Sequence, residues 1–178
     1  MTFKLANGEQ IRFRSVSPDD EPMVAEAFNT ASQETLLHRF FTPLRRLSSE
    51  QVRPLVMIDP LREVCVVGEL MAETGKRIVC GARYVRLTDP WIAEIALTVH
   101  DDYQGQGVGG CMLRHLIRLG RADGIRIFAA DVLATNGRML RLLEKLAPQR
   151  RSTLSGGVCR IEFDLADATL PTDDSSHN

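Results

Sequence analysis

A glycine-rich stretch and one acidic residue upstream of it are the parts of this sequence best suited to chemistry. Four glycines fall within residues 105–110, at the start of an amphipathic helix pattern over residues 108–124. A helix N-terminus carries unpaired backbone N–H groups and a partial positive charge, so it attracts phosphate. Glycines let a phosphate approach these groups and permit the positive φ angles of an anion-binding nest. The stretch predicts a phosphate-binding loop; the alternative is a flexible connection without a ligand.

The spacing of the glycines narrows the class of phosphate ligand. Gly105, Gly107 and Gly110 match the pattern G-x-G-x-x-G of dinucleotide-binding folds. In those folds the first glycine follows its strand almost directly, and further β-α-β units come after it. Here residues 100–104 intervene, and too little chain follows Gly105 for the remaining units. No Gly-Lys-Ser/Thr follows the glycines, so a Walker A loop is also excluded.

Glu94 is the candidate general base. In the expected strand 91–100, apolar side chains occupy the odd positions, and Glu94 points to the other face. A carboxylate in the middle of a central strand is costly to bury without a function or a partner. Desolvation there would raise its proton affinity towards that of a general base. A salt-bridged structural glutamate is the alternative interpretation.

The other reactive side chains favour packing over chemistry. The four cysteines are scattered, without metal-ligand spacing or the density of a disulfide scaffold, which indicates reduced core residues and no metal site. Cys111 and His115 lie on or beside the apolar stripe of the helix at 108–124 and are expected to be packed. For Asp101 and Asp102 we expect a solvated loop, with contact to a cationic substrate as the alternative.

Composition sets the protein class. The chain has 178 residues, of which 44% are hydrophobic and 25% charged, with a formal net charge of −1. These values suit one compact domain and argue against a globally basic nucleic-acid binder. No stretch is long and apolar enough to span a membrane, and no secretory signal follows Met1, so a cytoplasmic protein without a membrane or nucleic-acid partner is expected. A monomer and a homodimer remain open.

Hydrophobic periodicity predicts an α/β (α+β) fold. One domain over residues 1–168 is expected, with a mixed, mostly antiparallel sheet and helices on both faces, followed by a disordered polar tail at 169–178. Thr74-Gly75 is expected to form a hairpin turn. The expected elements are strands at 9–17, 63–73, 76–87, 91–100 and 125–133, helices at 17–31, 32–41, 48–58, 108–124 and 136–147, and a hairpin at 150–165.

The sequence resembles a known family. Gln104, Gly107 and Gly109 match the Q/R-x-x-G-x-G/A motif of the GNAT superfamily of N-acetyltransferases, which use acetyl-CoA. The strand before the motif, the helix after it and "NGRMLRLLEKL" resemble that family in order and spacing. Residues 32–70 resemble the acetyltransferase domain of bacterial protein lysine acetyltransferases of the Pat type. The resemblance covers about residues 9–165.

The resemblance implies a role for particular residues. Glu94 matches the strand glutamate that acts as general base, and Asn136 matches an asparagine that often contacts the pantetheine arm of CoA. A plain helix cap is an equal alternative for Asn136. The pantetheine arm would pair with the backbone of Leu97, Thr98 and Val99. The pyrophosphate would bind the backbone amides of Gln104, Gly105, Gln106, Gly107, Val108, Gly109 and Gly110.

The general acid of the family has no counterpart here. Many members carry a tyrosine on the helix after the asparagine, where this chain has Leu143, and neither Tyr84 nor Tyr103 matches that position. A CoA thiolate can take its proton from water. The expected function is acetyl-CoA-dependent transfer of an acetyl group to an amine, with a protein lysine side chain favoured. The alternatives are a small-molecule amine acceptor and a non-catalytic acyl-CoA-binding sensor.

Overall fold

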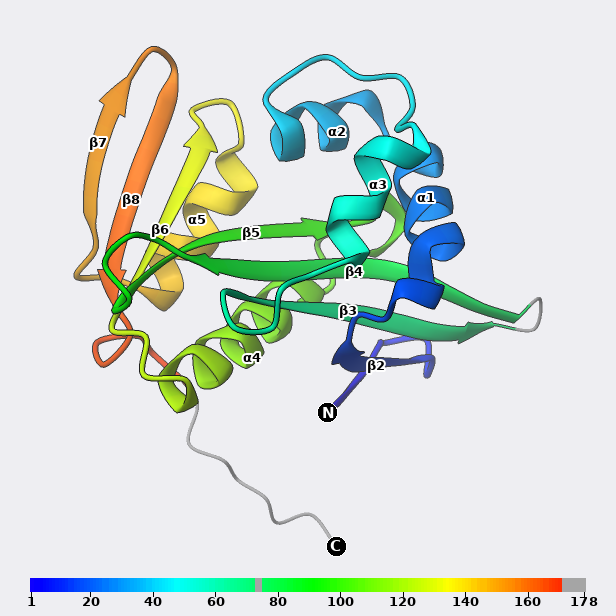
Figure 1. The fold of residues 1–178 in the computed structure, drawn as a ribbon, viewed down its shortest axis with the longest axis horizontal. Coiled ribbons are helices and arrows are strands. Elements are labelled where there is room, and N and C mark those ends of the chain that lie inside the picture. Colours follow the sequence, from blue (N-terminus) through cyan, green and yellow to red (C-terminus); the bar gives the residue numbers. More distant parts are fainter. Residues whose placement is uncertain (73–74, 171–178) are drawn as a thin grey trace, which may run out of the picture.

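The computed structural model describes residues 1–72 and 75–170. They form one eight-stranded sheet with helices on both faces (Figure 1). The strands are β1 (Thr2–Lys4), β2 (Gln10–Ser15), β3 (Glu63–Ala72), β4 (Gly75–Arg86), β5 (Ile92–Val99), β6 (Ile127–Leu133), β7 (Arg151–Ser155) and β8 (Val158–Asp164). The helices are α1 (Glu21–Thr30), α2 (Gln33–Phe40), α3 (Ser49–Val56), α4 (Val108–Ala122) and α5 (Gly137–Leu146), with 3-10 turns η1 (Pro18–Asp20) and η2 (Asp101–Tyr103).

The sheet is mixed and mostly antiparallel, as predicted. Its strand order is β1-β2-β3-β4-β5-β6-β8-β7. Only β5 and β6 pair in parallel, and the remaining neighbours are antiparallel. A parallel pair needs a crossover connection, which α4 provides here. The crossover therefore brings the glycine-rich segment to the end of β5.

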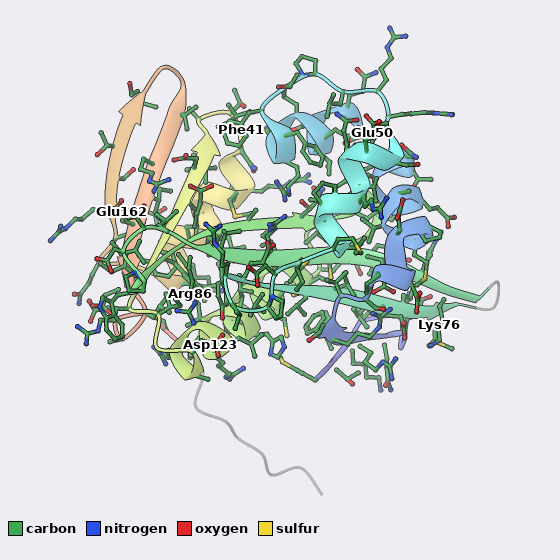
Figure 2. All side chains as sticks on the ribbon, viewed as in Figure 1. Phe41, Glu50, Lys76, Arg86, Asp123 and Glu162 are labelled. Atoms are coloured by element: carbon green, nitrogen blue, oxygen red, sulfur yellow. The ribbon has the colours of Figure 1, made fainter. Side chains whose placement is uncertain are left out.

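Each face of the sheet has its own hydrophobic core. The larger core packs α4 and α5 against the strands, and Val108, Met112 and Ile117 of α4 are fully buried in it. The smaller core packs α1 and α3 against Val67 of β3 and Ile78 of β4. Figure 2 shows the side chains that fill both layers. The sheet thus has covered faces on both sides, with α1–α3 opposite α4 and α5.

Side chains cap the N-termini of α2 and α3. Ser32 accepts a hydrogen bond from the Thr35 amide at 3.1 Å, which fixes the start of α2. The amide of Ser48 donates to the side chain of Gln51 at 2.9 Å at the start of α3. Such bonds satisfy the amides that a helix N-terminus leaves unpaired. Pro54 lies inside α3, which has only eight residues.

A buried charge cluster fixes the entry to α1. Arg14 of β2 donates to both carboxylate oxygens of Asp20 at 2.7 Å and to Glu69 of β3 at 2.8 Å. Glu69 is only 2% exposed. Burial by itself would raise the pKa of the Asp20 and Glu69 carboxyls. The hydrogen bonds and charge of the Arg14 guanidinium outweigh burial and hold both pKa values below their usual range. A buried ion pair of this kind is costly to break from one side.

Two differences from the expected fold concern the ends of the chain. Strand β1 was not predicted, because three residues are too few for a period-two pattern. The expected tail does not begin at residue 169: the Thr169 amide donates to the Leu146 carbonyl at 2.8 Å, and Leu170 packs against the larger core. Residues 171–178, and residue 74 of the predicted turn, lie outside the described residues. Within the described chain, every helix is too short or too polar to cross a membrane.

Candidate active site

The sheet opens between its two parallel strands. β5 and β6 pair only from Ile92 with Ile127 to Glu94 with Ala129. Beyond this point β5 continues its pairing with β4, and β6 continues with β8. Among the described strands, none pairs with the β6-facing edge of β5 from Ile95 to Val99. This edge can therefore hydrogen-bond a ligand that carries amide groups.

A groove with a volume of about 1080 Å³ lies at this opening. Its walls come from α2, β5, β6, α5 and the loop between η2 and α4. The sequence-predicted residues that line it are Glu94, Leu97, Thr98, Val99, Gln104, Gly105, Gly107, Gly109, Gly110 and Asn136. The side chains of Gln106 and Val108 point elsewhere: Gln106 donates to the Asp102 carbonyl at 2.8 Å, and Val108 is buried in the core. The groove is large enough for a cofactor-sized ligand.

The glycine loop has the backbone shape of an anion nest. Gly105 and Gly107 have φ angles of 75° and 86°, which favour glycine. Gly107 caps α4 without a side chain, and no acidic residue lies in the first turn. None of the amides of residues 105–110 donates a hydrogen bond to another described residue. The first helical hydrogen bond of α4 runs from the Cys111 amide to the Gly107 carbonyl. Six consecutive unpaired amides at a helix N-terminus form a positive cradle.

Gln104 differs from its expected role. Its backbone amide donates to the Asp101 carbonyl at 3.2 Å, so that amide is not available to a phosphate. Its side-chain amide donates to the Val99 carbonyl at 2.9 Å and to the Thr35 hydroxyl at 3.0 Å, and its carbonyl accepts from Arg138. Gln104 thus ties β5 and α2 to α5. The motif located this residue but did not predict that its side chain braces the groove.

Asp101 fixes α2 at the rim of the groove. It accepts hydrogen bonds from the Ser32 amide at 2.7 Å, the Ser32 hydroxyl at 2.6 Å and the Thr35 hydroxyl at 2.8 Å. Burial by itself would raise the pKa of Asp101, but these hydrogen bonds outweigh it and hold the pKa below its usual range. The expectation of a solvated residue is wrong for Asp101. Asp102 does have an exposed side chain.

Glu94 lies in the groove but is not desolvated. Its side chain is 50% exposed, and its carboxylate lies 3.2 Å from Arg160 of β8. Arg160 also lies 3.2 Å from Asp131 of β6, which lines the groove too. The expected burial is wrong because α1 and α3 pack on β3 and β4, further along the sheet, and α2 forms a wall of the groove without closing it. The partner Arg160 became visible only through the register of β6 and β8, which pairs it with Asp131.

Comparison with known proteins identifies this arrangement. The model of the acetyltransferase (GNAT) family matches residues 25–147. This chain belongs to the GNAT acetyltransferase family. It is therefore an acetyltransferase of a family whose members use acetyl-CoA.

The chain is similar to bacterial acetyltransferases within this family. It is 28% identical over 131 residues to acetyltransferase PA5475 of Pseudomonas aeruginosa, covering 73% of this chain and 70% of that protein. It is 31% identical over 147 residues to acetyltransferase Pat of Mycolicibacterium smegmatis, covering 80% of this chain but only 42% of Pat. The crystal structure of the GNAT domain of S. lividans PAT matches with a TM-score of 0.81 at 29% identity, covering 92% of this chain and 96% of that one.

Neither tyrosine of this GNAT domain lines the groove. Tyr84 is fully buried in the larger core and donates to Asp123. Tyr103 is buried and accepts from Arg77. Leu143, at the position of the usual tyrosine, has no exposed surface. The described groove therefore offers no phenol as a proton donor.

Two further side chains of the GNAT domain are packed, as predicted. Burial raises the pKa of Cys111, which is the opposite of what an activated thiol needs. His115 stacks on Phe13 with ring centroids 6.1 Å apart, and burial lowers its pKa.

Helix α5 adds a basic wall to the GNAT groove. Arg138 and Arg141 line it, whereas Lys145 of the same helix does not. Asn136 caps α5 through a hydrogen bond from the Met139 amide at 3.1 Å and also lines the groove. The cap is confirmed, and the contact of Asn136 with the pantetheine arm stays a prediction. The sequence did not single out Arg39 of α2, which lines the groove as well, because a lone arginine on an amphipathic helix is usually solvated.

Proposed function

We propose that this chain transfers the acetyl group of acetyl-CoA directly to an amine, with a protein lysine side chain as the favoured acceptor. One observation carries the proposal: Gly105, Gly107, Gly109 and Gly110, whose amides have no partner among the described residues, line the same groove as the free edge of β5 and the carboxylate of Glu94. The similarity to Pat proteins favours a protein acceptor. The match spans less than half of the M. smegmatis Pat.

The groove fits the parts of CoA in order. The pyrophosphate would bind the amides of Gly105 to Gly110, whose bare backbone permits close approach. The amide-bearing pantetheine arm would add to β5 along Leu97 to Val99, as an extended peptide adds to a sheet edge. Arg138 and Arg141 lie where they can pair with the remaining phosphate. This order leaves the thioester beside Glu94.

Glu94 would act as the general base. A lysine-type amine is mostly protonated at neutral pH and must lose a proton before it can attack. The half-exposed carboxylate of Glu94 can take that proton directly or through one water, while Arg160 fixes its orientation. Asp131 contacts the same arginine and is the second candidate. The leaving thiolate would take its proton from water, because no tyrosine reaches the described groove.

Thiol release from acetyl-CoA in the presence of lysine peptides tests this proposal. Glu94→Gln should lower kcat by about 10²- to 10⁴-fold, the usual contribution of a general base, with CoA affinity unchanged. Glu162→Gln is the matched control, since Glu162 also lies beside Arg160, at 3.6 Å, but does not line the groove. Equal turnover in wild type and Glu94→Gln, with loss in Asp131→Asn, would transfer the role to Asp131.

A non-catalytic acyl-CoA sensor is the second candidate function. Two observations favour it: Glu94 is paired with Arg160, and neither tyrosine lines the groove. A sensor binds CoA but releases no thiol with any acceptor, whereas the proposed enzyme does both. A panel of small amines beside the lysine peptides separates a small-molecule acceptor from a protein acceptor in the same assay.

A further inference from the structure

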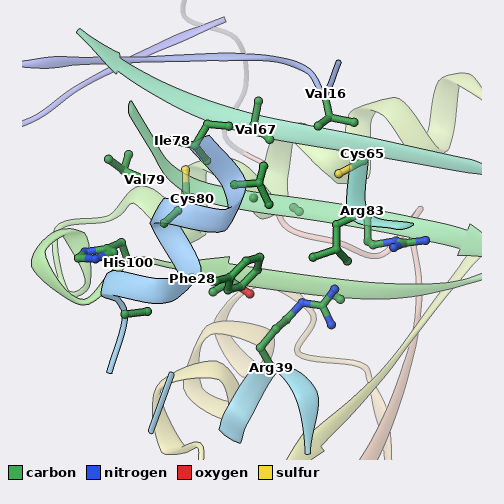
Figure 3. A pocket seen from close by; sticks show the side chains of 18 residues that line it. Val16, Phe28, Arg39, Cys65, Val67, Ile78, Val79, Cys80, Arg83 and His100 are labelled. Carbon is green, nitrogen blue, oxygen red and sulfur yellow. The ribbon is translucent and has the colours of Figure 1, made fainter. Parts of the chain in front are cut away.

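A second, smaller pocket lies beside the groove, under α1 and α2. It has a volume of about 70 Å³ and is lined mainly by apolar side chains of α1, β3 and β4. Two arginines break this apolar lining: Arg39 of α2 and Arg83 of β4. Figure 3 shows Arg39 extending from its helix towards the sheet, in which β4 carries Arg83. Arg39 and Thr98 line both the pocket and the groove, so the two spaces meet at these residues.

Three hydrogen-bond donors at this junction have no partner among the described residues. No hydrogen bond or ion pair joins Arg39 to the described chain; its one recorded contact is with the Phe40 ring, 5.1 Å from the centroid. The Nε of Arg83 and the hydroxyl of Thr98 are buried and also lack a described partner. Buried polar groups in proteins are nearly always satisfied, so the two buried donors, together with the partly buried guanidinium of Arg39, indicate a ligand.

The junction is positively charged. Glu63 pairs with the terminal nitrogen of Arg83 and so compensates one of the two guanidinium groups. Burial, and then the charge of Arg83, lower the pKa of Arg39 to about 10, which leaves Arg39 a cation at neutral pH. Cys65 lies on the same wall, and burial raises its pKa to about 11, so it supplies no negative charge. The missing partner of these donors is therefore expected to be an anion.

The position of the junction relates it to the acceptor. Arg83 pairs in register with Ala96, which lies two residues along β5 from Glu94 on the same face. Two residues of a strand span about 7 Å. A group bound at Arg39 would thus lie a few bonds from an amine at Glu94. It would also lie on the face of β5 that carries Glu94, opposite the face covered by α4.

We propose that Arg39, together with the Arg83 Nε and the Thr98 hydroxyl, binds a carboxylate of the acceptor, so that the preferred acceptor is an amine with a nearby acidic group. The inference rests on the proposed acetyl transfer. A carboxylate accepts two parallel bonds from a guanidinium and further bonds from its neighbours, which matches the donors present. The acceptor would be held at both ends, with its amine at the acidic side of the groove near Glu94 and Asp131.

The carboxylate has two possible sources, and two matched acceptor pairs separate them. The first pair is Nα-acetyl-lysine and its methylamide, which differ only in the free carboxylate. The second pair is a blocked lysine peptide with glutamate beside the lysine and the same peptide with glutamine there. The measurement is kcat/KM for each acceptor at saturating acetyl-CoA. Whichever pair shows a preference for the acidic member identifies the source.

In the wild type the acidic member of at least one pair should be preferred by about tenfold or more, as expected for a charge-assisted pair in a partly buried site. Arg39→Gln should reduce that ratio to within about twofold, and Arg39→Lys should retain part of it, because lysine keeps the charge but loses the planar fork. Arg46→Gln is the control for net charge, since Arg46 is exposed and lines neither space. It should leave the ratio unchanged.

Two results would overturn the inference: equal kcat/KM for both members of both pairs in the wild type, or an undiminished preference in Arg39→Gln. If Arg39→Gln does not fold, Arg39→Lys and Thr98→Val carry the same comparison. Absence of thiol release with every acceptor would instead refute the proposed enzyme. In that case calorimetric titration with Nα-acetyl-lysine and its methylamide, with and without CoA, tests the carboxylate site directly. Binding of Nα-acetyl-lysine but not of its methylamide, lost in Arg39→Gln, would support the site. Equal binding of the two compounds, or no binding of either, would reject it.

Discussion

Gly107 meets two structural demands that no other residue type meets together. Its φ angle of 86° lies in the left-handed region, and it caps α4 without a side chain above the unpaired amides of the first turn. A Cβ built there would lie 3.5 Å from the Phe3 ring, so sterics alone do not exclude a side chain. The reason for glycine is therefore the backbone conformation and the access it gives to the amides.

Replacing Gly107 by valine should abolish CoA binding, because a β-branched residue cannot keep this φ angle and would cover the amides. Isothermal titration with CoA measures the effect, and a loss of at least about 100-fold is expected if pyrophosphate contacts supply about 3 kcal/mol. Gly8→Val is the control for strain: Gly8 has a φ angle of 93° with no atom within 4 Å of its Cβ, and it does not line the groove. Equal affinity in both variants would place the pyrophosphate elsewhere.

Sequence patterns located side chains better than they described their surroundings. Alternation along β5 placed Glu94 on the correct face, but its exposure depends on where α1 and α3 pack, which no local pattern contains. The glycine motif likewise located the cradle without revealing that the Gln104 amide is already bonded. Arg39 carried no sequence signal, because its lack of a partner is a property of the folded chain.

At the scale of elements, the acceptor side of the groove depends on how α2 is held. Its N-terminus is bound to Asp101 by three hydrogen bonds of 2.6 to 2.8 Å, and Gln104 adds a bond to Thr35. These contacts join a helix from the first quarter of the chain to the loop after β5. They also position Arg39, one helical turn beyond Thr35, over the junction of the two spaces.

Asp101→Asn should lower the free energy of unfolding at pH 7 by about 2 kcal/mol, since hydrogen bonds to a charged group contribute about 1.5 to 3 kcal/mol. Urea unfolding measures this, and Asp102→Asn, at an exposed neighbour, should change little. Because the folded-state pKa of Asp101 lies below its unfolded value of about 3.9, the contribution is present above about pH 4 and is lost as pH falls through the folded value. A difference between wild type and variant that does not shrink as pH falls below about 4 would contradict this assignment.

The elements themselves were largely predictable, whereas the gap between β5 and β6 was not. Apolar alternation and capping residues gave the strands from Gln10 onward and all five helices to within a few residues of their observed ends. The β5–β6 ladder ends early, at Glu94 and Ala129, and this long-range pairing is contained in no local sequence pattern. The groove is a consequence of that pairing.

The whole molecule consists of two packed layers on a sheet that is interrupted in the middle. Strands β1 to β5 form one part and β6 to β8 the other, and only three residue pairs join the two parts across the parallel ladder. Helices α4 and α5 pack behind this weak seam in the larger core. A ligand that adds to the edge of β5 and contacts α4 and α5 would therefore stabilise the contact between the two parts of the sheet.

Saturation with CoA should for this reason stabilise the entire fold and slow hydrogen exchange locally. At a CoA concentration of about 100 times Kd, linkage predicts about 2.7 kcal/mol of added stability, which corresponds to a rise in Tm of about 5 to 10 °C for a domain of this size. Exchange should slow at the amides of residues 95–99 that face the gap and at residues 105–110, while the exposed strand β7 stays unchanged. A rise in Tm without protection at residues 105–110 would show that CoA binds outside the cradle. Protection of the cradle without protection of β5 would keep the pyrophosphate site and reject strand addition by the pantetheine arm.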